Sequence, residues 1–409
     1  MRGTVSILLF TLLAVGAPAQ DTLRICTYNV LDFPNSLGSE RIPYFITVIN
    51  GLDPDVLVCQ EMMSTAGAEQ FLQDVLDPLE WSRSQYVTQG DNDVELYFKS
   101  DLFTLQAIHT IETELRNFEI YELASLNGTN RPILYVASSH LKASSGVENE
   151  QRRLAEVQSF RAYLNANPLP GNNLLLGGDL NLYSSAEPAY QALLEDSCFI
   201  DPLNAPGEWH NNSGFAGIHT QSTRITEFGG GSTGGLDDRF DFILTTPELA
   251  DSTDWDYCAA SYTAYGNDGE HFNQAINVPP NAVVSAEIAA ALHYASDHLP
   301  VYVDLVYLGE TGIKPKLPAT NPDYSVVVLY PNPFNQQFHV SLALPNPGVV
   351  QLDLMDVQGR KLATWNYDDL PSGSHDLVFD ASDLASGLYF LHVTLPNQIH
   401  TLSKVVLVK

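Results

Sequence analysis

The sequence is poor in cysteine, with only four among 409 residues, at positions 26, 59, 198 and 258. No two of them have the Cys-x-x-Cys spacing of a zinc or redox site, so we exclude cysteine chemistry as the function. An even number is compatible with disulfides in an exported protein. Cys198 and Cys258 are the better candidates for a bridge, because Cys26 and Cys59 lie in apolar, strand-like runs and fit buried side chains at least as well.

Basic residues are also scarce. The chain has 19 Lys and Arg against 49 Asp and Glu, a formal net charge of −30 at pH 7. This charge opposes long-range attraction to nucleic acid or to an anionic membrane, and it argues against a high-affinity DNA-binding module. It does not exclude an enzyme that brings divalent cations to a phosphate, because the ion supplies local positive charge.

Long apolar runs are absent beyond the N-terminus. There, Met1-Arg-Gly precedes an apolar run over 5–15 and then Ala17-Pro-Ala19, which predicts a signal peptide over 1–19. The run is too short for a permanent membrane helix, so we expect a protein exported through the periplasm without stable membrane insertion. The glycine-rich segment 229–235 lacks the Gly-Lys-Ser/Thr ending of a nucleotide-binding loop and fits a loop beside a site.

The pattern of apolar residues predicts two domains. In residues 20–307, strands alternate with helices but hairpins are frequent, which favours a four-layer α/β/β/α sandwich of two mixed sheets flanked by helices. A Pro-rich polar stretch at 308–324 predicts a linker. Residues 325–409 then read as short alternating strands with turns, a small all-β sandwich without a convergent set of catalytic groups.

The expected elements of the first domain follow from apolar periodicity. One prediction concerns side-chain exposure: the helix over 148–164 should bury Leu154, Val157, Phe160 and Leu164 and leave Arg152, Arg153 and Glu156 in solvent. A hairpin turn is expected at 127–130. We expect strands over 22–30, 55–61, 94–98, 103–111, 118–123, 132–140, 174–179, 238–244 and 296–303, and helices over 40–50, 66–76, 148–164 and 188–196.

Polar groups follow the apolar strands at the points where they end. The clearest case is Leu174-Leu-Leu-Gly-Gly-Asp-Leu-Asn181, which presents Asp179 and Asn181 at a strand tip. Each such residue has an ordinary alternative, because Asn and Asp terminate strands and a single His is more often structural than catalytic. Together they predict an active site at a sheet edge. The full set is Asn29, Glu61, His140, Asp179, Asn181, Asp241, Asp297 and His298.

These side chains suggest phosphoester hydrolysis. Mg²⁺-like ions prefer oxygen ligands, which Glu61, Asn29 and Asp297 could provide directly or through water. A histidine such as His298, oriented by a buried carboxylate such as Asp241, has a pKa suited to a general base. In the same hypothesis, Asp179 and Asn181 hold the attacking water, and His140 donates to the phosphate oxygens as charge builds up on them.

Six ordered motifs resemble the endonuclease/exonuclease/phosphatase superfamily, which includes pancreatic deoxyribonuclease, apurinic endonucleases, inositol-phosphate phosphatases and bacterial sphingomyelinases. The resemblance covers about Leu23 to Val306, and it is specific for fold and reaction type but weak for substrate. The motifs are Thr27-Tyr-Asn-Val, Gln60-Glu, Ser139-His-Leu, Gly178-Asp-Leu-Asn, Arg239-Phe-Asp-Phe-Ile and Ser296-Asp-His-Leu-Pro.

The resemblance implies a role for each residue. Glu61 would be the main metal ligand with Asn29 in support, and Asp297 would support a metal or the histidine. Asp241 and His298 would form the acid–base pair, and Asp179 and Asn181 would place water and phosphate. His140 matches the second histidine of the secreted nuclease and sphingomyelinase branches. Arg116 stands where some members have a phosphate-contacting arginine, although its surrounding sequence matches poorly.

The C-terminal region is similar to the sorting domains of Bacteroidetes type IX secretion. The similarity rests on Tyr330-Pro-Asn-Pro-Phe, Asp356-Val-Gln-Gly-Arg-Lys, Ser386-Gly-Leu-Tyr-Phe and the final Ser403-Lys-Val-Val-Leu-Val-Lys. It implies recognition by the type IX machinery and a secreted or cell-surface location. The alternative is an ordinary carbohydrate-binding or adhesive sandwich.

The leading hypothesis from the sequence is a secreted, Mg²⁺-dependent phosphodiesterase, with Mn²⁺ or Ca²⁺ as alternative ions. We expect a monomer that acts on nucleic acid with low sequence specificity. A sphingomyelinase-like or other small phosphoester hydrolase is the rival in the same class, although no strongly apolar hairpin for membrane entry is evident. A binding module that kept the fold and lost catalysis is the alternative from another class.

Overall fold

The computed structural model describes residues 22–85, 93–127, 131–250, 254–258 and 261–307, and, towards the C-terminus, 325–330, 337–344, 347–356, 360–382, 384–385, 387–395 and 399–407. The chain divides into two compact units, Met1–Thr311 and Gly312–Lys409. The predicted signal peptide, most of the hairpin turn at 127–130 and the predicted linker lie outside the described residues.

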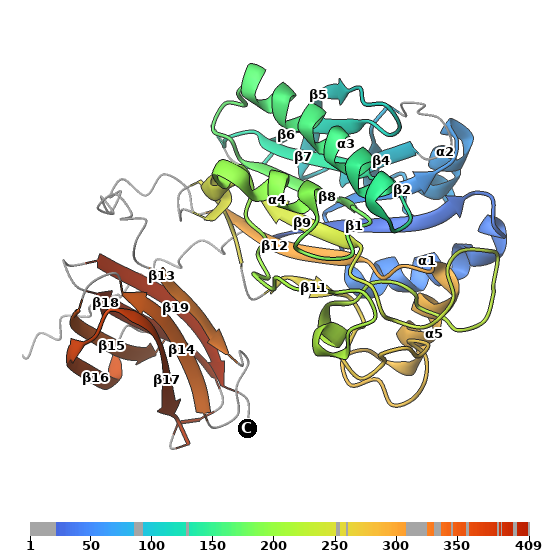
Figure 1. The fold of residues 1–409 in the computed structure, drawn as a ribbon. Helices are drawn as coiled ribbons and strands as arrows, with labels where there is room; N and C mark the ends of the chain where they lie inside the picture. Colours follow the sequence, from blue (N-terminus) through green and yellow to red (C-terminus); the bar gives the residue numbers. More distant parts are fainter. Residues whose placement is uncertain are drawn as a thin grey trace, which may run out of the picture. The chain divides into compact units, whose positions relative to one another are not determined.

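Two mixed sheets form the first unit (Figure 1). The larger has the order β10-β12-β1-β2-β4-β3 with β11 on β12, and the smaller has the order β5-β6-β7-β8-β9. The pairs β1/β2 and β7/β8 are parallel, whereas the others are antiparallel. The strands are β1 (Thr22–Phe33), β2 (Val56–Met62), β3 (Trp81–Arg83), β4 (Asp93–Lys99), β5 (Phe103–Ile111), β6 (Phe118–Ser125), β7 (Leu134–His140), β8 (Leu174–Asp179), β9 (Asp241–Thr245), β10 (Trp255–Tyr257), β11 (Thr263–Ala264) and β12 (Val301–Tyr307).

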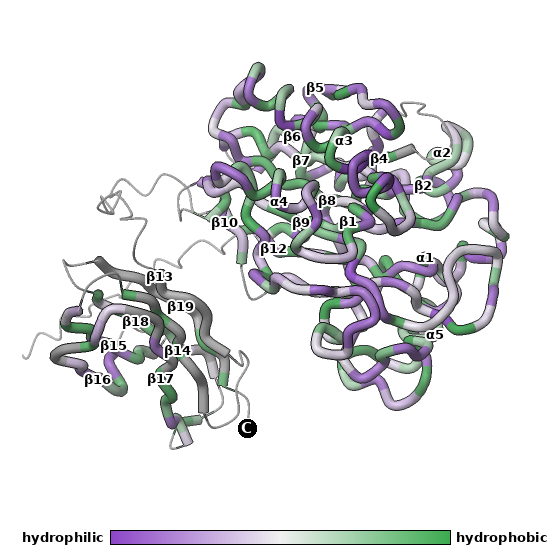
Figure 2. The backbone as a smooth tube through the Cα atoms, viewed as in Figure 1, coloured by the Kyte–Doolittle hydropathy of each residue, from purple (hydrophilic) through white to green (hydrophobic). Residues whose placement is uncertain are grey.

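Helices cover the outer face of each sheet, so the predicted α/β/β/α sandwich is confirmed. One core lies between the two sheets. A second lies between the larger sheet and its helices, and a third between the smaller sheet and its helices. Hydrophobic and hydrophilic stretches alternate along both strands and helices (Figure 2), and the hydrophobic side chains of the strands fill these layers. Helices α1 (Gly38–Leu52), α2 (Thr65–Asp74) and α5 (Ala286–Ala295) pack on the larger sheet, and α3 (Val147–Ala166) and α4 (Pro188–Leu194) on the smaller.

Two expected strand boundaries near the site are wrong. β9 begins at Asp241 rather than at residue 238, and β12 begins at Val301 rather than at residue 296. The segment before β12 also contains a helix that the apolar pattern did not predict, α5, whose N-cap Ser285 accepts the Ile288 N–H. Asp297 therefore lies in the connection after α5, not within a strand.

Two charged residues of α3 are buried, so the prediction that Arg153 and Glu156 are solvated is wrong. Arg153 is 0% exposed; it donates to the carboxylate of Glu187 at 2.9 Å and to the carbonyls of Lys142 and Ser144. Glu156 accepts the Lys142 N–H at 3.1 Å. These charges are buried because they satisfy the backbone of the connection that leaves β7.

The predicted disulfide between Cys198 and Cys258 is wrong, since no described cysteine forms a disulfide. Cys198 packs with the core under α3 and α4, whereas Cys258 follows β10 at the edge of the larger sheet. The two residues thus belong to different layers. Cys26 and Cys59 are buried in β1 and β2.

The second unit is built from two antiparallel sheets of order β13-β14-β17 and β16-β15-β18-β19, with a shared apolar core. Within the described residues, no helix of either unit is long and apolar enough to cross a membrane. The strands are β13 (Ser325–Tyr330), β14 (Gln337–Leu344), β15 (Gly348–Asp356), β16 (Lys361–Leu370), β17 (Gly373–Asp380), β18 (Gly387–Leu395) and β19 (Ile399–Leu407).

Candidate active site

The C-terminal parts of β1, β2, β7 and β8 carry polar groups of the site; Asn29 stands where the regular pairing of β1 with β2 ends. Parallel neighbours end on the same side, which is why the residues at the ends of β1 and β2, and of β7 and β8, are brought together. In register, Asn29 pairs with Gln60, and His140 pairs with Asp179. Asp179 also pairs with Asp241 at the start of antiparallel β9.

Asn29 connects the two sheets. Its Nδ2 donates to Glu61 Oε1 at 3.0 Å and to Asp179 Oδ2 at 3.1 Å. Its Oδ1 accepts the N–H of Leu31 at 3.0 Å. In this arrangement Asn29 orients the two carboxylates, and its own oxygen serves the backbone.

Glu61 enters the site through a distortion of β2. Its φ of 60° is left-handed, and the register between β2 and β4 shifts after Cys59. Its Oε2 accepts the Asp32 N–H at 3.0 Å, a contact that the sequence did not indicate. Burial raises the pKa of the Glu61 carboxyl, and the charge of Asp297 adds to this shift. The carboxylate is therefore short of positive charge.

Asp297 lies against the glycine-rich loop 229–235. Its Oδ2 accepts the Ser232 N–H at 2.6 Å, whereas its buried Oδ1 has no hydrogen-bond partner in the described part of the chain. A Cβ atom on Gly231 would lie 2.7 Å from Asp297 Oδ2, and the φ of Gly231 is 77°. Both facts require glycine where the loop passes the carboxylate.

His298 and Asp241 form a hydrogen-bonded pair in which His298 Nδ1 lies 2.7 Å from Asp241 Oδ2. His298 Nε2 lies 3.6 Å from Asp179 Oδ2. Burial by itself lowers the pKa of His298, but the charges of Asp241 and Asp179 outweigh burial and raise it well above the ordinary value. The pair has the geometry of a base oriented by a carboxylate.

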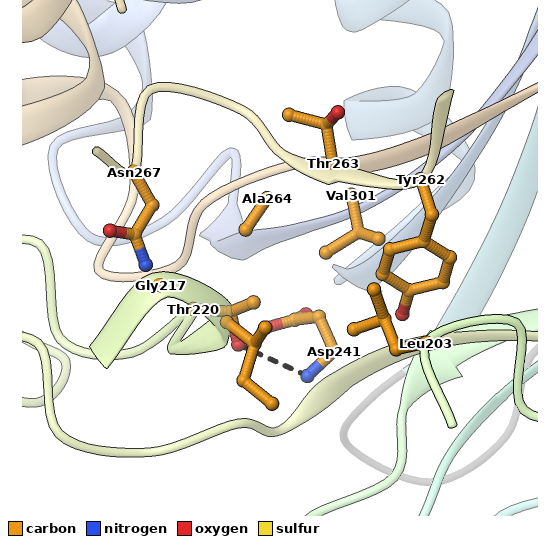
Figure 3. Close-up of a pocket in the computed structure, with 10 residues that line it drawn as sticks. Leu203, Gly217, Thr220, Asp241, Tyr262, Thr263, Ala264, Asn267 and Val301 are labelled. Carbon is orange, nitrogen blue, oxygen red and sulfur yellow. Dashed lines mark hydrogen bonds between the residues drawn. The ribbon is translucent and has the colours of Figure 1, made fainter. Parts of the chain in front are cut away.

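A small cavity of about 110 Å³ lies beside Asp241 (Figure 3). The second oxygen of this carboxylate, Oδ1, is buried and has no hydrogen-bond partner among the described residues. The Asp241 N–H donates to Thr220 Oγ1 at 3.1 Å, and Thr220, Tyr262 and Asn267 add polar groups to the lining. The cavity is large enough for water and polar enough to hold it.

Gln221 contacts the catalytic histidine candidate and was not predicted. Its Nε2 lies 2.6 Å from His298 Nε2, on the opposite side of the ring from Asp241. Gln221 is reached by an isolated antiparallel bridge to Asp238 and another to His298. Such pairing between distant segments leaves no signal in the sequence around Gln221.

His140 and Asp179 have strongly perturbed pKa values. His140 Nε2 lies 3.5 Å from Asp179 Oδ2. Burial, with the nearby charge of Arg116, lowers the pKa of His140 well below its ordinary value. Burial raises the pKa of Asp179 to about 7, against the opposing charge of His298. His140 is therefore neutral and able to donate one hydrogen bond.

Arg116 and Asn181 both bind the backbone just after β7. Arg116 donates to the carbonyl of Leu141 at 2.7 Å, and Asn181 Nδ2 donates to the same oxygen at 3.2 Å. The Asn181 N–H also donates to Asp179 Oδ1 at 3.1 Å. These contacts fix the end of β7, and thereby His140, against Asp179.

The structure places all nine sequence-predicted residues in or beside one network. Eight of them surround the edge described above, and Arg116 contributes through the backbone of the strand end that carries His140. Gln221 and Asp32 complete the network. The ligand atoms of Glu61, His140 and Asp179 lie within 4.8 Å of one another, as do those of Asp179, Asp241 and His298.

Residues 328–409 match the family model of the secretion system C-terminal sorting domain, so the chain carries a signal for export. No curated protein matches the sequence.

Several solved structures are similar to this chain at low identity. An endonuclease/exonuclease/phosphatase family protein from Bacteroides thetaiotaomicron has 13% identity and a TM-score of 0.46, covering 71% of this chain and 99% of its own. TDP2 from D. rerio, complexed with single strand DNA product, has 17% identity and a TM-score of 0.48, covering 69% and 98%. The human Nocturnin catalytic domain with bound sulfate has 17% and 0.47, covering 70% and 97%.

Proposed function

We propose that this protein is a secreted, divalent-metal-dependent phosphodiester hydrolase that cleaves nucleic acid with low sequence specificity. The observation that carries the proposal is the His298–Asp241 pair at 2.7 Å, placed beside Asp179 and a group of carboxylates that lack positive partners. A base and a group of anionic oxygen ligands are what metal-assisted hydrolysis of a phosphoester by activated water requires.

The acidic residues fit a divalent cation. Asp297 Oδ1 is buried without a hydrogen-bond partner in the described residues, and burial with neighbouring charge raises the pKa of Glu61 and of Asp32. Oxygen donors in this setting suit Mg²⁺, Mn²⁺ or Ca²⁺. Glu61 and Asp297 would hold the ion, and Asn29 would orient Glu61. When bound, the cation would neutralise charge on a phosphate oxygen. It would also reduce the electrostatic repulsion between an anionic substrate and a protein of net charge −30.

The chain's own side chains supply the proton transfers. The neutral form of His298 takes the proton of the attacking water at Nε2, while Asp241 Oδ2 keeps the ring oriented and stabilises the imidazolium that forms. Asp179 lies 3.6 Å from Nε2 and is placed to align that water, with Asn181 holding Asp179. Neutral His140 donates to a non-bridging phosphate oxygen as charge develops.

The two units have separate roles in this proposal. A signal peptide over 1–19 directs export, the catalytic domain spans 20–307, and a linker over 308–324 leads to the sorting domain over 325–409. The match to a sorting domain supports delivery by type IX secretion to the cell surface or medium. We propose that the enzyme acts as a monomer.

A substrate panel tests the function. The purified full chain is assayed on plasmid DNA, RNA, sphingomyelin, a sugar phosphate and bis(p-nitrophenyl) phosphate, with Mg²⁺, Mn²⁺ or Ca²⁺ and with chelator. We expect metal-dependent cleavage of nucleic acid without sequence preference. Turnover of sphingomyelin or the sugar phosphate alone would show that the enzyme acts on a small phosphoester rather than on nucleic acid. No turnover of any substrate would contradict catalysis.

A further inference from the structure

Two His–Asp pairs of the first unit differ in how completely they are satisfied. In the first, His271 Nδ1 lies 2.8 Å from Asp268 Oδ1, and His271 Nε2 lies 2.7 Å from the Val278 carbonyl. Asp268 also accepts the N–H groups of Glu270 and Ala282. Both side chains are 3% exposed, so this pair is a saturated structural element.

The second pair has a ring nitrogen and a carboxylate oxygen that form no hydrogen bond within the described residues. His210 Nδ1 lies 2.7 Å from Asp238 Oδ1, and the His210 side chain is 53% exposed. Asp238 as a whole is only 7% exposed, yet its other oxygen accepts no hydrogen bond from the described residues. Asp237 adds a second carboxylate, and one ligand atom from each of the three residues lies within 4.8 Å of the others.

The backbone holds the three residues in place. The Asn211 N–H donates to the Asp237 carbonyl at 2.7 Å, which ties the His210 segment to the two aspartates. The Asp238 N–H donates to the Gln221 carbonyl at 3.0 Å, and the Gln221 N–H donates back at 3.1 Å. The ring of Tyr183 packs edge-on against His210 at 5.3 Å. A metal ion would therefore meet ligand atoms that the backbone already holds in position.

The charges of the cluster do not balance. Burial raises the pKa of Asp238 to about 6, with His210 opposing this shift and Asp237 adding to it. Burial also raises the pKa of Asp237, again opposed by His210. Two carboxylates thus lie within reach of a single imidazole. A cation would relieve the repulsion between them.

We propose that His210, Asp237 and Asp238 form a second divalent-cation site, separate from Glu61 and Asp297. One imidazole nitrogen and two carboxylate oxygens suit a first-row transition ion such as Mn²⁺. The exposed imidazole gives the ion a route from solvent, and the buried carboxylate of Asp238 anchors it.

The position of this site suggests what the cation does. Asp238 pairs with Gln221, whose side chain contacts His298 at 2.6 Å. A cation at the second site would bring positive charge next to the proposed base and attract a further phosphate of a polyanionic substrate. This consequence rests on the proposed function, whereas the binding of the ion does not.

Mn²⁺ alone tests the site, without substrate. Metal-stripped full chain is titrated with Mn²⁺, and bound ion is counted by electron paramagnetic resonance. We expect two sites in the unchanged protein and one in Glu61→Gln. In that background, electron spin echo modulation should show a directly bound nitrogen. His210→Ala should remove that nitrogen signal, and the nearly isosteric Asp237→Asn should weaken binding about tenfold or more.

His109→Gln is the matched control. His109 Nε2 lies 2.7 Å from Glu122, as His210 lies from Asp238, but Tyr163 already occupies its Nδ1 at 3.0 Å. This control should leave both Mn²⁺ sites intact. The proposal is overturned if Glu61→Gln binds no Mn²⁺, or if binding in that background survives His210→Ala and Asp237→Asn unchanged. An inactive enzyme that still shows the nitrogen signal would defeat the proposed function and leave this site standing.

Discussion

Two buried carboxylates, one in each unit, are treated in opposite ways. In the second unit, Asp353 on β15 is 2% exposed and accepts from Lys361 at 2.7 Å, Thr364 at 2.6 Å and Gln351 at 3.0 Å. Burial opposes its charge, but these partners hold its pKa at about 2. In the first unit, Asp179 is equally buried and its pKa is raised to about 7.

The difference separates a carboxylate whose oxygens are fully hydrogen-bonded from carboxylates that are not. Both carboxylate oxygens of Asp353 accept hydrogen bonds from neighbouring side chains. The carboxylate therefore stabilises its sheet and leaves neither oxygen free for a ligand. At the site, Glu61 is short of positive charge and Asp297 Oδ1 has no described partner. Buried carboxylates without hydrogen-bond donors or positive neighbours are suited to bind a cation, a proton or a substrate.

The largest expected effect comes from the proton-transferring side of the site. His298→Ala should lower kcat by about 10²- to 10⁴-fold, because the base is lost while the substrate-binding groups remain. Added Mg²⁺ or Mn²⁺ should not restore the rate. Initial rates on plasmid DNA measure this, with His109→Gln as the control for loss of an unrelated histidine. Near wild-type kcat in a folded His298→Ala protein would remove His298 from the mechanism.

Glu61→Gln should have a smaller effect, and one that can be reversed. The change removes charge and nearly keeps shape, so metal affinity should fall by roughly 10- to 100-fold, a range found when even a supporting partner of a ligand is removed. Activity should return as the metal concentration rises. Rate against Mg²⁺ concentration is the measurement, and a titration curve identical to wild type would contradict the ligand assignment.

Asp353→Asn tests the saturated side of the comparison. Because the folded pKa of about 2 lies below the ordinary value of 3.8, Asp353 contributes stability that is present above pH 3.8 and lost as pH falls towards 2. We expect the variant to lose on the order of 2 kcal/mol of unfolding free energy at pH 6. Near pH 2 the difference from wild type should vanish. Urea unfolding, monitored through the hydrogen exchange of β15 peptides, measures the unfolding free energy of the two proteins at each pH. A difference between them that does not change with pH would refute the assignment.

The smallest expected effect is that of removing the second unit. Each unit has its own core, and the site contacts described above all lie within the first. A chain ending after Tyr307 should therefore keep its kcat on DNA within about twofold, because domains with separate cores fold independently. In the native host it should fail to reach the medium. Loss of both folding and activity would show that the second unit stabilises the first.

The sequence predicted Asn29, Glu61, His140, Asp179 and Asn181 because each lies in or just after the C-terminal part of a recognisable apolar strand. Asp241, Asp297 and His298 instead lie at the start of β9 or before β12. Runs such as 55–61 and 174–179 have strong strand signals, and their polar ends emerge where parallel strands must place them. The same logic fails for Gln221, which reaches His298 through bridges between segments far apart in the chain. No local pattern marks such a residue.

Each of the remaining errors has its own physical cause. Charged residues on a helix are expected in solvent, yet Arg153 and Glu156 are buried because the connection after β7 offers them unpaired backbone groups. Composition suggested a bridge between Cys198 and Cys258, but a disulfide also needs proximity, which the layer order denies. Helix α5 was missed because its alanine-rich sequence is bounded by irregular segments.

The contact between Gln221 and His298 gives the base a partner that can follow its proton. A carboxamide turned by half a rotation about its last bond keeps its outline but exchanges nitrogen for oxygen. Gln221 Nε2 lies 2.6 Å from His298 Nε2. In this orientation it would donate to a ring whose Nε2 carries no hydrogen, and the rotated amide would offer its oxygen to a ring whose Nε2 does. In the proposed mechanism, such a rotation would let Gln221 hydrogen-bond His298 both before and after the ring takes up the proton.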